Sequence, residues 1–164
     1  MIISKIQVFN KNYYNIFNKN LYLLFVILKL DSGVDEINII CYGLGSIYDN
    51  FSSRYQFALL LLLIDEIDIL KQDINSKLFL KVVQLYDPVF NQTDKYLLRN
   101  VYKFNVSEQN YQCFCSVDVN NIINRLNLFY MPHCGKALYN NLLFSNWSVN
   151  QLESIVLLGK INIK

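Results

Sequence analysis

Apolar segments that read as strands alternate along this chain with segments that read as helices, and this alternation constrains the fold most. Apolar, β-branched runs predict buried strands at 37–42, 79–86 and 126–131. Spacing and end signals add helices at 10–30, 53–70, 91–100 and 136–146, and further strands at 101–105, 113–117 and 153–158. The order predicts an α/β fold, with a single Rossmann-like, doubly wound, mostly parallel sheet and an N-terminal helical arm.

Length and apolar runs set the domain organisation. The 164 residues fit one domain, which we divide into a basic, aromatic arm and helix at 1–30 and an α/β domain at 31–164. The longest apolar runs, at 21–28 and 57–64, are far shorter than the ~20 residues that span a bilayer as a helix. We therefore expect a cytoplasmic or nuclear protein with reduced thiols and no membrane partner.

Charge is distributed unevenly although the net charge is only +2. Residues 1–30 carry +4, residues 31–68 carry −6 and residues 69–164 carry +4. In the arm, basic residues alternate with tyrosines, and such a pattern stacks on unpaired RNA bases while lysines neutralise phosphate. The candidate RNA or partner contacts are Lys5, Lys11, Tyr13, Tyr14 and Lys19. The alternative is an amphipathic helix that covers the sheet, with its lysines in water.

A Gly-Leu-Gly turn at 43–45 follows the first predicted strand and precedes a helix. This is the context of phosphate and nucleotide binding, because glycine lets backbone N–H groups approach an anion. However, Tyr48 stands where a third glycine belongs, and Asp87 lies 42 residues after Gly45 instead of about 20. The alternatives are a tight turn that needs glycine's backbone freedom and an Asp87 that caps the turn after its strand.

A second group of candidates follows the strand at 126–131. His133, the only histidine, adjoins Cys134 at the start of a helix, where the dipole lowers a thiol pKa. Adjacent residues on an extended chain point to opposite sides, so we assign no catalytic dyad. We assign no metal site either, because the cysteine and histidine spacings differ from those of zinc knuckles. The complete candidate ligand pocket is Gly43, Gly45, Ser46, Asp87, His133, Cys134 and Tyr139.

Several of these motifs occur in a familiar order. The stretches are Cys-Tyr-Gly-Leu-Gly-Ser at 41–46, Gln-Phe-Ala-Leu-Leu-Leu-Leu-Leu at 56–63, Tyr-Asp-Pro-Val-Phe at 86–90, Leu-Phe-Tyr-Met-Pro-His-Cys at 128–134, Lys-Ala-Leu-Tyr-Asn-Asn-Leu-Leu at 136–143 and Asn-Trp at 146–147. This set resembles the sensitivity-to-red-light-reduced (SRR-like) domain family over residues 37–159. The chain departs from the family pattern in three places. Gly135 stands where the family usually has proline, and Thr93 or Asp94 occupies the position after Asp-Pro-Val-Phe where an acid is usual. The family's Asn-Ser-Phe ending is absent and is replaced by residues 160–164.

The resemblance implies a regulator, with links to clock control, haem synthesis and growth phenotypes, and it implies no particular reaction. We therefore expect a non-catalytic SRR-like regulatory or interaction protein, and lean against an enzyme. For a small protein with a Lys- and Tyr-rich arm, the expected partner is a large cytoplasmic assembly such as the ribosome, contacted through ribosomal RNA, and the expected effect is to silence translation. The alternative is a small Rossmann-type enzyme that uses a nucleotide or S-adenosylmethionine; otherwise we expect no cofactor.

Overall fold

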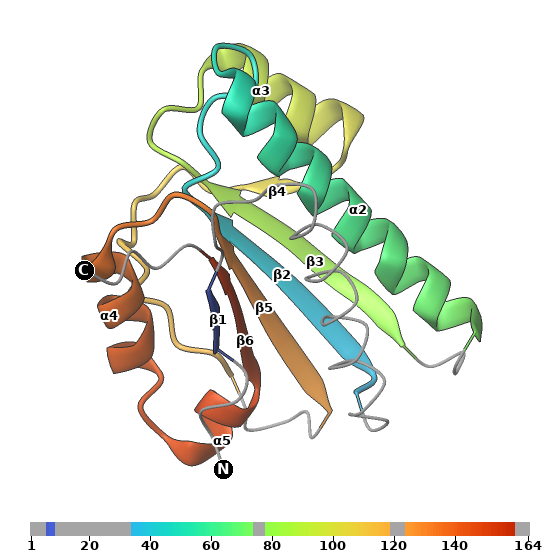
Figure 1. Ribbon diagram of the computed structural model, residues 1–164, viewed down its shortest axis with the longest axis vertical. Coiled ribbons are helices and arrows are strands. Elements are labelled where there is room, and N and C mark those ends of the chain that lie inside the picture. The colour runs from blue at the N-terminus through green and yellow to red at the C-terminus, as the bar shows by residue number, and fades with distance from the viewer. Residues whose placement is uncertain (1–5, 9–33, 74–77, 119–123, 160–164) are drawn as a thin grey trace.

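The fold is built on a parallel sheet of six strands (Figure 1). The computed structural model describes residues 6–8, 34–73, 78–118 and 124–159. The strands are β1 (Ile6–Val8), β2 (Glu36–Tyr42), β3 (Phe79–Tyr86), β4 (Asn105–Val106), β5 (Arg125–Met131) and β6 (Ile155–Gly159). The helices are α2 (Phe51–Asp73), α3 (Gln92–Tyr96), the π-helix η2 (Leu97–Val101), α4 (Lys136–Ser145) and α5 (Val149–Glu153).

The strand order is β1-β6-β5-β2-β3-β4, and all five pairings are parallel. The five strands from β2 onward therefore have the Rossmann order, with β2 as the first strand and the chain reversing its direction of travel between β2 and β5. This confirms the predicted doubly wound α/β fold. Residues 6–8, which the sequence analysis placed in the arm, form a sixth strand on β6, whereas the predicted helix at 10–30 lies outside the described residues.

Each face of the sheet is covered by its own apolar layer. On one face α2 packs on β2 and β3, and Leu60, Leu63 and Ile67 of α2 are almost fully buried. On the other face Tyr139 and Leu142 of α4 pack with side chains of β5 and β6. None of the helices in the described part of the chain is long and apolar enough to cross a membrane.

Two of the shorter predicted elements are wrong. Instead of a strand at 101–105, the π-helix continues to Val101 and β4 consists of two residues. The segment at 113–117 forms no strand, because a side chain at the end of α4 satisfies its backbone. The buried Asn146 accepts a 2.7 Å hydrogen bond from the Val117 N–H and donates one of 2.8 Å to the Cys115 carbonyl.

The start of α2 also differs from the prediction. The sequence predicted a helix from 53, but α2 begins at Phe51. The Asn50 side chain accepts a 2.9 Å hydrogen bond from the Ser52 N–H, the role of a residue that precedes a helix. Ser53 lies instead in the first turn, buried, where its hydroxyl closely approaches Gly45.

Candidate functional site

Three loops converge at the carboxyl ends of β2, β3 and β5, where ligands bind in doubly wound sheets. Gly43 follows β2 with a φ of +70°, a conformation that favours glycine. A Cβ atom on Gly43 would lie 2.9 Å from the Cys134 Sγ and 3.2 Å from the His133 carbonyl carbon. The loops after β2 and β5 are therefore in close contact at the point where the strand order reverses.

The carboxylate of Asp87 is bound to the glycine turn itself. Its Oδ2 accepts a 2.8 Å hydrogen bond from the Gly45 N–H, and its Oδ1 accepts a 3.0 Å bond from the Val89 N–H. Gly45 has a φ of +78°, and the Ser53 hydroxyl occupies the space that a Cβ would need. The buried Asp87 thus occupies the position at the Gly45 amide that a phosphate would take in a nucleotide-binding turn.

A second polar cluster links the loop after β2 to the start of α3. The Ser46 hydroxyl and the Asp49 carboxylate share a 3.1 Å hydrogen bond, and the Asn91 amide donates to both, at 3.4 and 2.9 Å respectively. The fully buried Asp94 accepts hydrogen bonds from the Tyr48 N–H at 2.9 Å and the Asn91 N–H at 3.1 Å. Ser46 and Asp94 therefore serve to hold the loops in register.

The thiol of Cys134 lies inside this junction. Its Sγ donates to the Tyr42 carbonyl at 3.4 Å. Burial, with a further contribution from the Asp87 charge, raises the pKa of Cys134 to about 12. The expectation that the helix dipole lowers this pKa is wrong, because desolvation of the thiolate outweighs the dipole. The neutral thiol at physiological pH argues against a nucleophilic role for Cys134.

The remaining pocket candidates, His133 and Tyr139, differ in burial. His133 is exposed, whereas Tyr139 is buried and donates a 2.7 Å hydrogen bond from its hydroxyl to the Met131 carbonyl, next to Gly159. Tyr48 is 62% exposed. The structure therefore brings Gly43, Gly45, Asp87 and Cys134 together, with Ser46 nearby. His133 joins them through its backbone only, and the Tyr139 hydroxyl lies against Met131 and Gly159 instead.

Sequence reasoning missed part of this junction. Ser53, Asn91 and Asp94 were not among the candidate site residues. Ser53 was assigned to a helix start, and the Asn-x-x-Asp spacing at 91–94 is likewise a helix-start pattern. Cys113 and Cys115 lie in the same apolar cluster as Cys134, around Tyr42. Burial raises the pKa of Cys113, Cys115 and Tyr42. Among the described residues, no group of His, Cys, Asp and Glu side chains has the arrangement of a metal site.

The candidate RNA contacts in the arm cannot be placed relative to the site. Of the candidate RNA contacts, Lys5, Lys11, Tyr13, Tyr14 and Lys19 all lie outside those residues.

Comparisons with known proteins identify the family of this chain. The family model of the SRR1 domain matches residues 21–161. The chain is 33% identical to the SRR1-like protein of Mus musculus over 79% of its own length and 46% of that protein. It is 31% identical to Protein SENSITIVITY TO RED LIGHT REDUCED 1 of Arabidopsis thaliana over 76% of its own length and 39% of that protein. The chain thus spans less than half of either relative, and no solved structure matches it significantly.

A parallel sheet in the Rossmann order, with its glycine turn closed by an aspartate that follows the next strand, defines a Rossmann-like α/β protein. Within that class, the chain belongs to the SRR1 family. The resemblance seen in the motifs at 41–46, 86–90 and 128–134 is thereby confirmed.

Proposed function

We propose that this SRR1-family chain is a non-catalytic regulatory protein that acts by binding a partner. The observation that carries the proposal is the Asp87 carboxylate on the Gly45 N–H, because the anion position of the glycine turn is filled by the protein's own side chain. The neutral Cys134 thiol supports the same conclusion. The name of the Arabidopsis relative, which describes reduced sensitivity to red light, fits a regulatory role.

The proposed partner is a large cytoplasmic assembly, specifically the ribosome, where binding silences translation. Two features support it. The basic, aromatic composition of residues 1–30 suits contact with RNA. On the described part of the chain, two aromatic side chains are exposed near the loops that follow β2 and β3 (Tyr48 and Tyr96). Exposed aromatic rings are available to stack on unpaired bases.

Co-sedimentation with ribosomes tests this proposal. We expect the full chain to sediment with purified ribosomes at low salt and to be released progressively as salt rises, because phosphate contacts release counterions. The double variant Lys5→Ala/Lys11→Ala should bind more weakly and with a smaller salt slope. The matched control, Lys71→Ala/Lys136→Ala, removes two exposed lysines outside the arm and should bind like the original chain.

A translation assay separates binding from silencing. Added protein should reduce the yield of a cell-free translation reaction in proportion to the ribosome fraction bound. A chain that remains at the top of the gradient at every salt concentration would contradict ribosome binding. Binding without any loss of translation would contradict silencing alone.

One observation favours a second candidate, a nucleotide- or S-adenosylmethionine-dependent enzyme. The strand order places Gly43–Ser46 at the point between β2 and β5 where Rossmann-like proteins bind such ligands. Binding would require the ligand to displace Asp87 from the Gly45 N–H. A melting temperature that rises and saturates with ATP, NAD or S-adenosylmethionine would support this candidate. No shift with any of the three at millimolar concentration would count against it.

A further inference from the structure

The outward side of α2 carries a mostly apolar stripe that is exposed and does not pack on the rest of the described chain. Residues that face the sheet, such as Leu60, Leu63 and Ile67, are buried. On the opposite side, residues separated by steps of four and three line up along the helix. This seam consists of Phe51, Tyr55, Ala58, Leu62, Asp65 and Ile69, all of them exposed.

The exposure of the seam is unusual for a helix that covers a sheet. Phe51 is 66% exposed, Tyr55 62%, Leu62 36% and Ile69 46%. A surface helix normally presents polar residues to water on this side. Figure 1 shows α2 along the outer border of the molecule. Spacing by four and three is the pattern by which one helix packs against another in a coiled coil.

The order of residues along the seam indicates the partner, because the seam is complementary to itself in the antiparallel direction. When two copies cross at residue 60, Phe51 faces Ile69 of the second copy. The small Ala58 faces the larger Leu62, which gives close packing on both sides of the axis. The Tyr55 hydroxyl faces the Asp65 carboxylate, to which it can donate a hydrogen bond.

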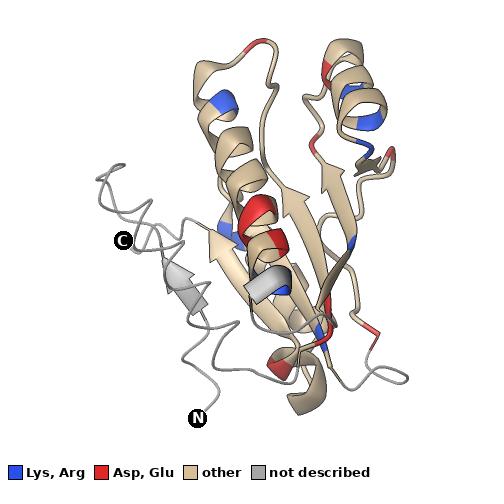
Figure 2. Ribbon diagram, turned by 90° about the vertical axis from the view of Figure 1, so that its right-hand side faces the viewer, with Lys and Arg blue, Asp and Glu red and all other residues tan. Residues whose placement is uncertain are grey.

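The charges beside the seam fit the same arrangement. Arg54 flanks one end of the seam and Asp68 the other, so antiparallel copies place each Arg54 beside the Asp68 of the second copy. Figure 2 shows a basic band near one end of α2 and acidic bands nearer the other. The Arg54 side chain is already held in place, since it donates to the carbonyls of Ile47 at 2.9 Å and Tyr48 at 2.7 Å.

We propose that α2 is the interface of a symmetric homodimer, in which the seams of two copies of this chain pack antiparallel about a two-fold axis. A two-fold interface requires that residue i meets j while j meets i, and the seam meets this condition at each of its three layers. The interface is confined to about five turns of one helix, so the dimer dissociates on dilution. The proposal is independent of the proposed function, because the candidate RNA contacts in the arm are not part of the seam.

Sedimentation velocity of the full chain over a wide range of concentrations tests the proposal. We expect a monomer–dimer equilibrium for the original chain. Leu62→Glu places a charge in the central layer and should weaken dimerisation by about tenfold or more. The control Val101→Glu changes an exposed apolar residue on η2 and should dimerise like the original chain. Circular dichroism checks that each variant is folded.

A charge exchange tests the register. Asp68→Lys alone brings a new ammonium group beside Arg54 of the second copy, and the two positive charges repel. Arg54→Glu alone brings a new carboxylate beside Asp68 of the second copy, and the two negative charges repel. Each variant should therefore dimerise weakly by itself. Mixed together, the two variants should form a heterodimer, because both ends of the seam then pair opposite charges. At one end the introduced carboxylate meets the introduced ammonium group, and at the other end Arg54 meets Asp68.

An original chain that stays monomeric up to its solubility limit would overturn the homodimer. Equal dimerisation by the Leu62→Glu variant would overturn the seam as its interface. Failure of the mixed pair, with both variants folded, would overturn the antiparallel register.

Discussion

At the scale of single residues, the junction of three loops depends on atoms that only the fold brings together. Gly45 and Asp87 are 42 positions apart, yet the Gly45 N–H donates to the Asp87 carboxylate at 2.8 Å. The sequence offered two interpretations of each residue: a ligand contact, or a turn and its cap. The hydrogen bonds to the Gly45 and Val89 N–H groups give Asp87 the capping role in this structure.

Replacing Gly45 with alanine should therefore destabilise the protein. The φ of +78° is strained for a residue with a side chain, and the new Cβ would collide with the Ser53 hydroxyl. We expect a loss of about 2 kcal/mol or more in the free energy of unfolding, measured by urea denaturation. The control is Gly135→Ala, where a Cβ meets nothing within 4 Å, and its loss should stay under about 1 kcal/mol. Equal losses in the two variants would contradict this account of Gly45.

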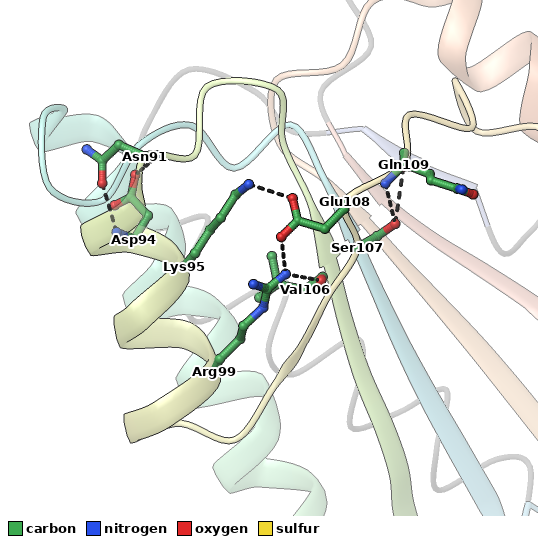
Figure 3. Close-up of polar contacts among 8 residues, drawn as sticks. All are labelled: Asn91, Asp94, Lys95, Arg99, Val106, Ser107, Glu108 and Gln109. Atoms are coloured by element: carbon green, nitrogen blue, oxygen red, sulfur yellow. Dashed lines mark hydrogen bonds and ion pairs between the residues drawn. The ribbon is translucent and has the colours of Figure 1, made fainter.

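At the scale of elements, an ion-pair cluster fixes the short helices to the segment after β4. The Glu108 carboxylate lies between the Lys95 ammonium group at 2.6 Å and the Arg99 guanidinium at 2.5 Å (Figure 3). Arg99 also donates to the Val106 carbonyl at 2.8 Å. Hydrogen bonds from Lys95 and Arg99 lower the pKa of Glu108 below its ordinary value. The cluster thus connects α3 and η2 to the edge of the sheet.

This lowered pKa predicts a pH-dependent effect of Glu108→Gln. A carboxylate whose folded-state pKa is depressed stabilises the fold above its unfolded pKa and loses that contribution as pH falls through the folded pKa. The variant should be slightly less stable than the original chain at pH 7, and the difference should disappear in acid. Because the cluster is exposed, high salt should also reduce the difference.

Urea denaturation at several pH values checks this prediction. Glu153→Gln, which removes an exposed carboxylate from α5, is the control and should show no comparable pH-dependent loss. A Glu108→Gln difference that stays constant from neutral pH into acid would refute the electrostatic explanation.

At the scale of the whole molecule, the middle of the sheet is its most enclosed part. β2 pairs with both β3 and β5, and six of the seven residues of β5 are buried. β4, by contrast, is a two-residue strand at one edge. Stability should therefore decrease from the centre of the sheet toward the β4 edge.

Amide hydrogen exchange measures this gradient. We expect the slowest exchange in β2 and β5, because their amides are hydrogen-bonded within the sheet and covered on both faces. The amides of Asn105 and Val106 should exchange much faster. Protection in β4 equal to that in β5 would mean that the sheet opens as one unit, contrary to the expectation.

Features that depend on neighbouring residues were predicted correctly, and features that depend on contacts between distant segments were not. β3 occurs at 79–86 as predicted, and β2 and β5 each begin one residue earlier than predicted, because a buried strand needs an apolar run that is visible locally. The strand predicted at 113–117 failed because Asn146, about thirty residues away, satisfies its backbone. The raised pKa of Cys134 was not predicted, because burial of its thiol depends on the distant segments that follow β2 and β3. The helix start beside Cys134 can be recognised locally, and it suggested the opposite shift.

The sequence by itself determined the class of fold, the family and the position of the glycine turn, since each depends on patterns within short segments or on their order. The tertiary structure alone decided which groups meet at the site. It placed Asp87 on the Gly45 N–H, Ser53 against Gly45 and Cys134 against Gly43, contacts between segments far apart in the chain or folded back on one another. It also showed that one apolar side of α2 is buried and the other exposed, because burial depends on where the sheet lies and cannot be read from helical spacing alone.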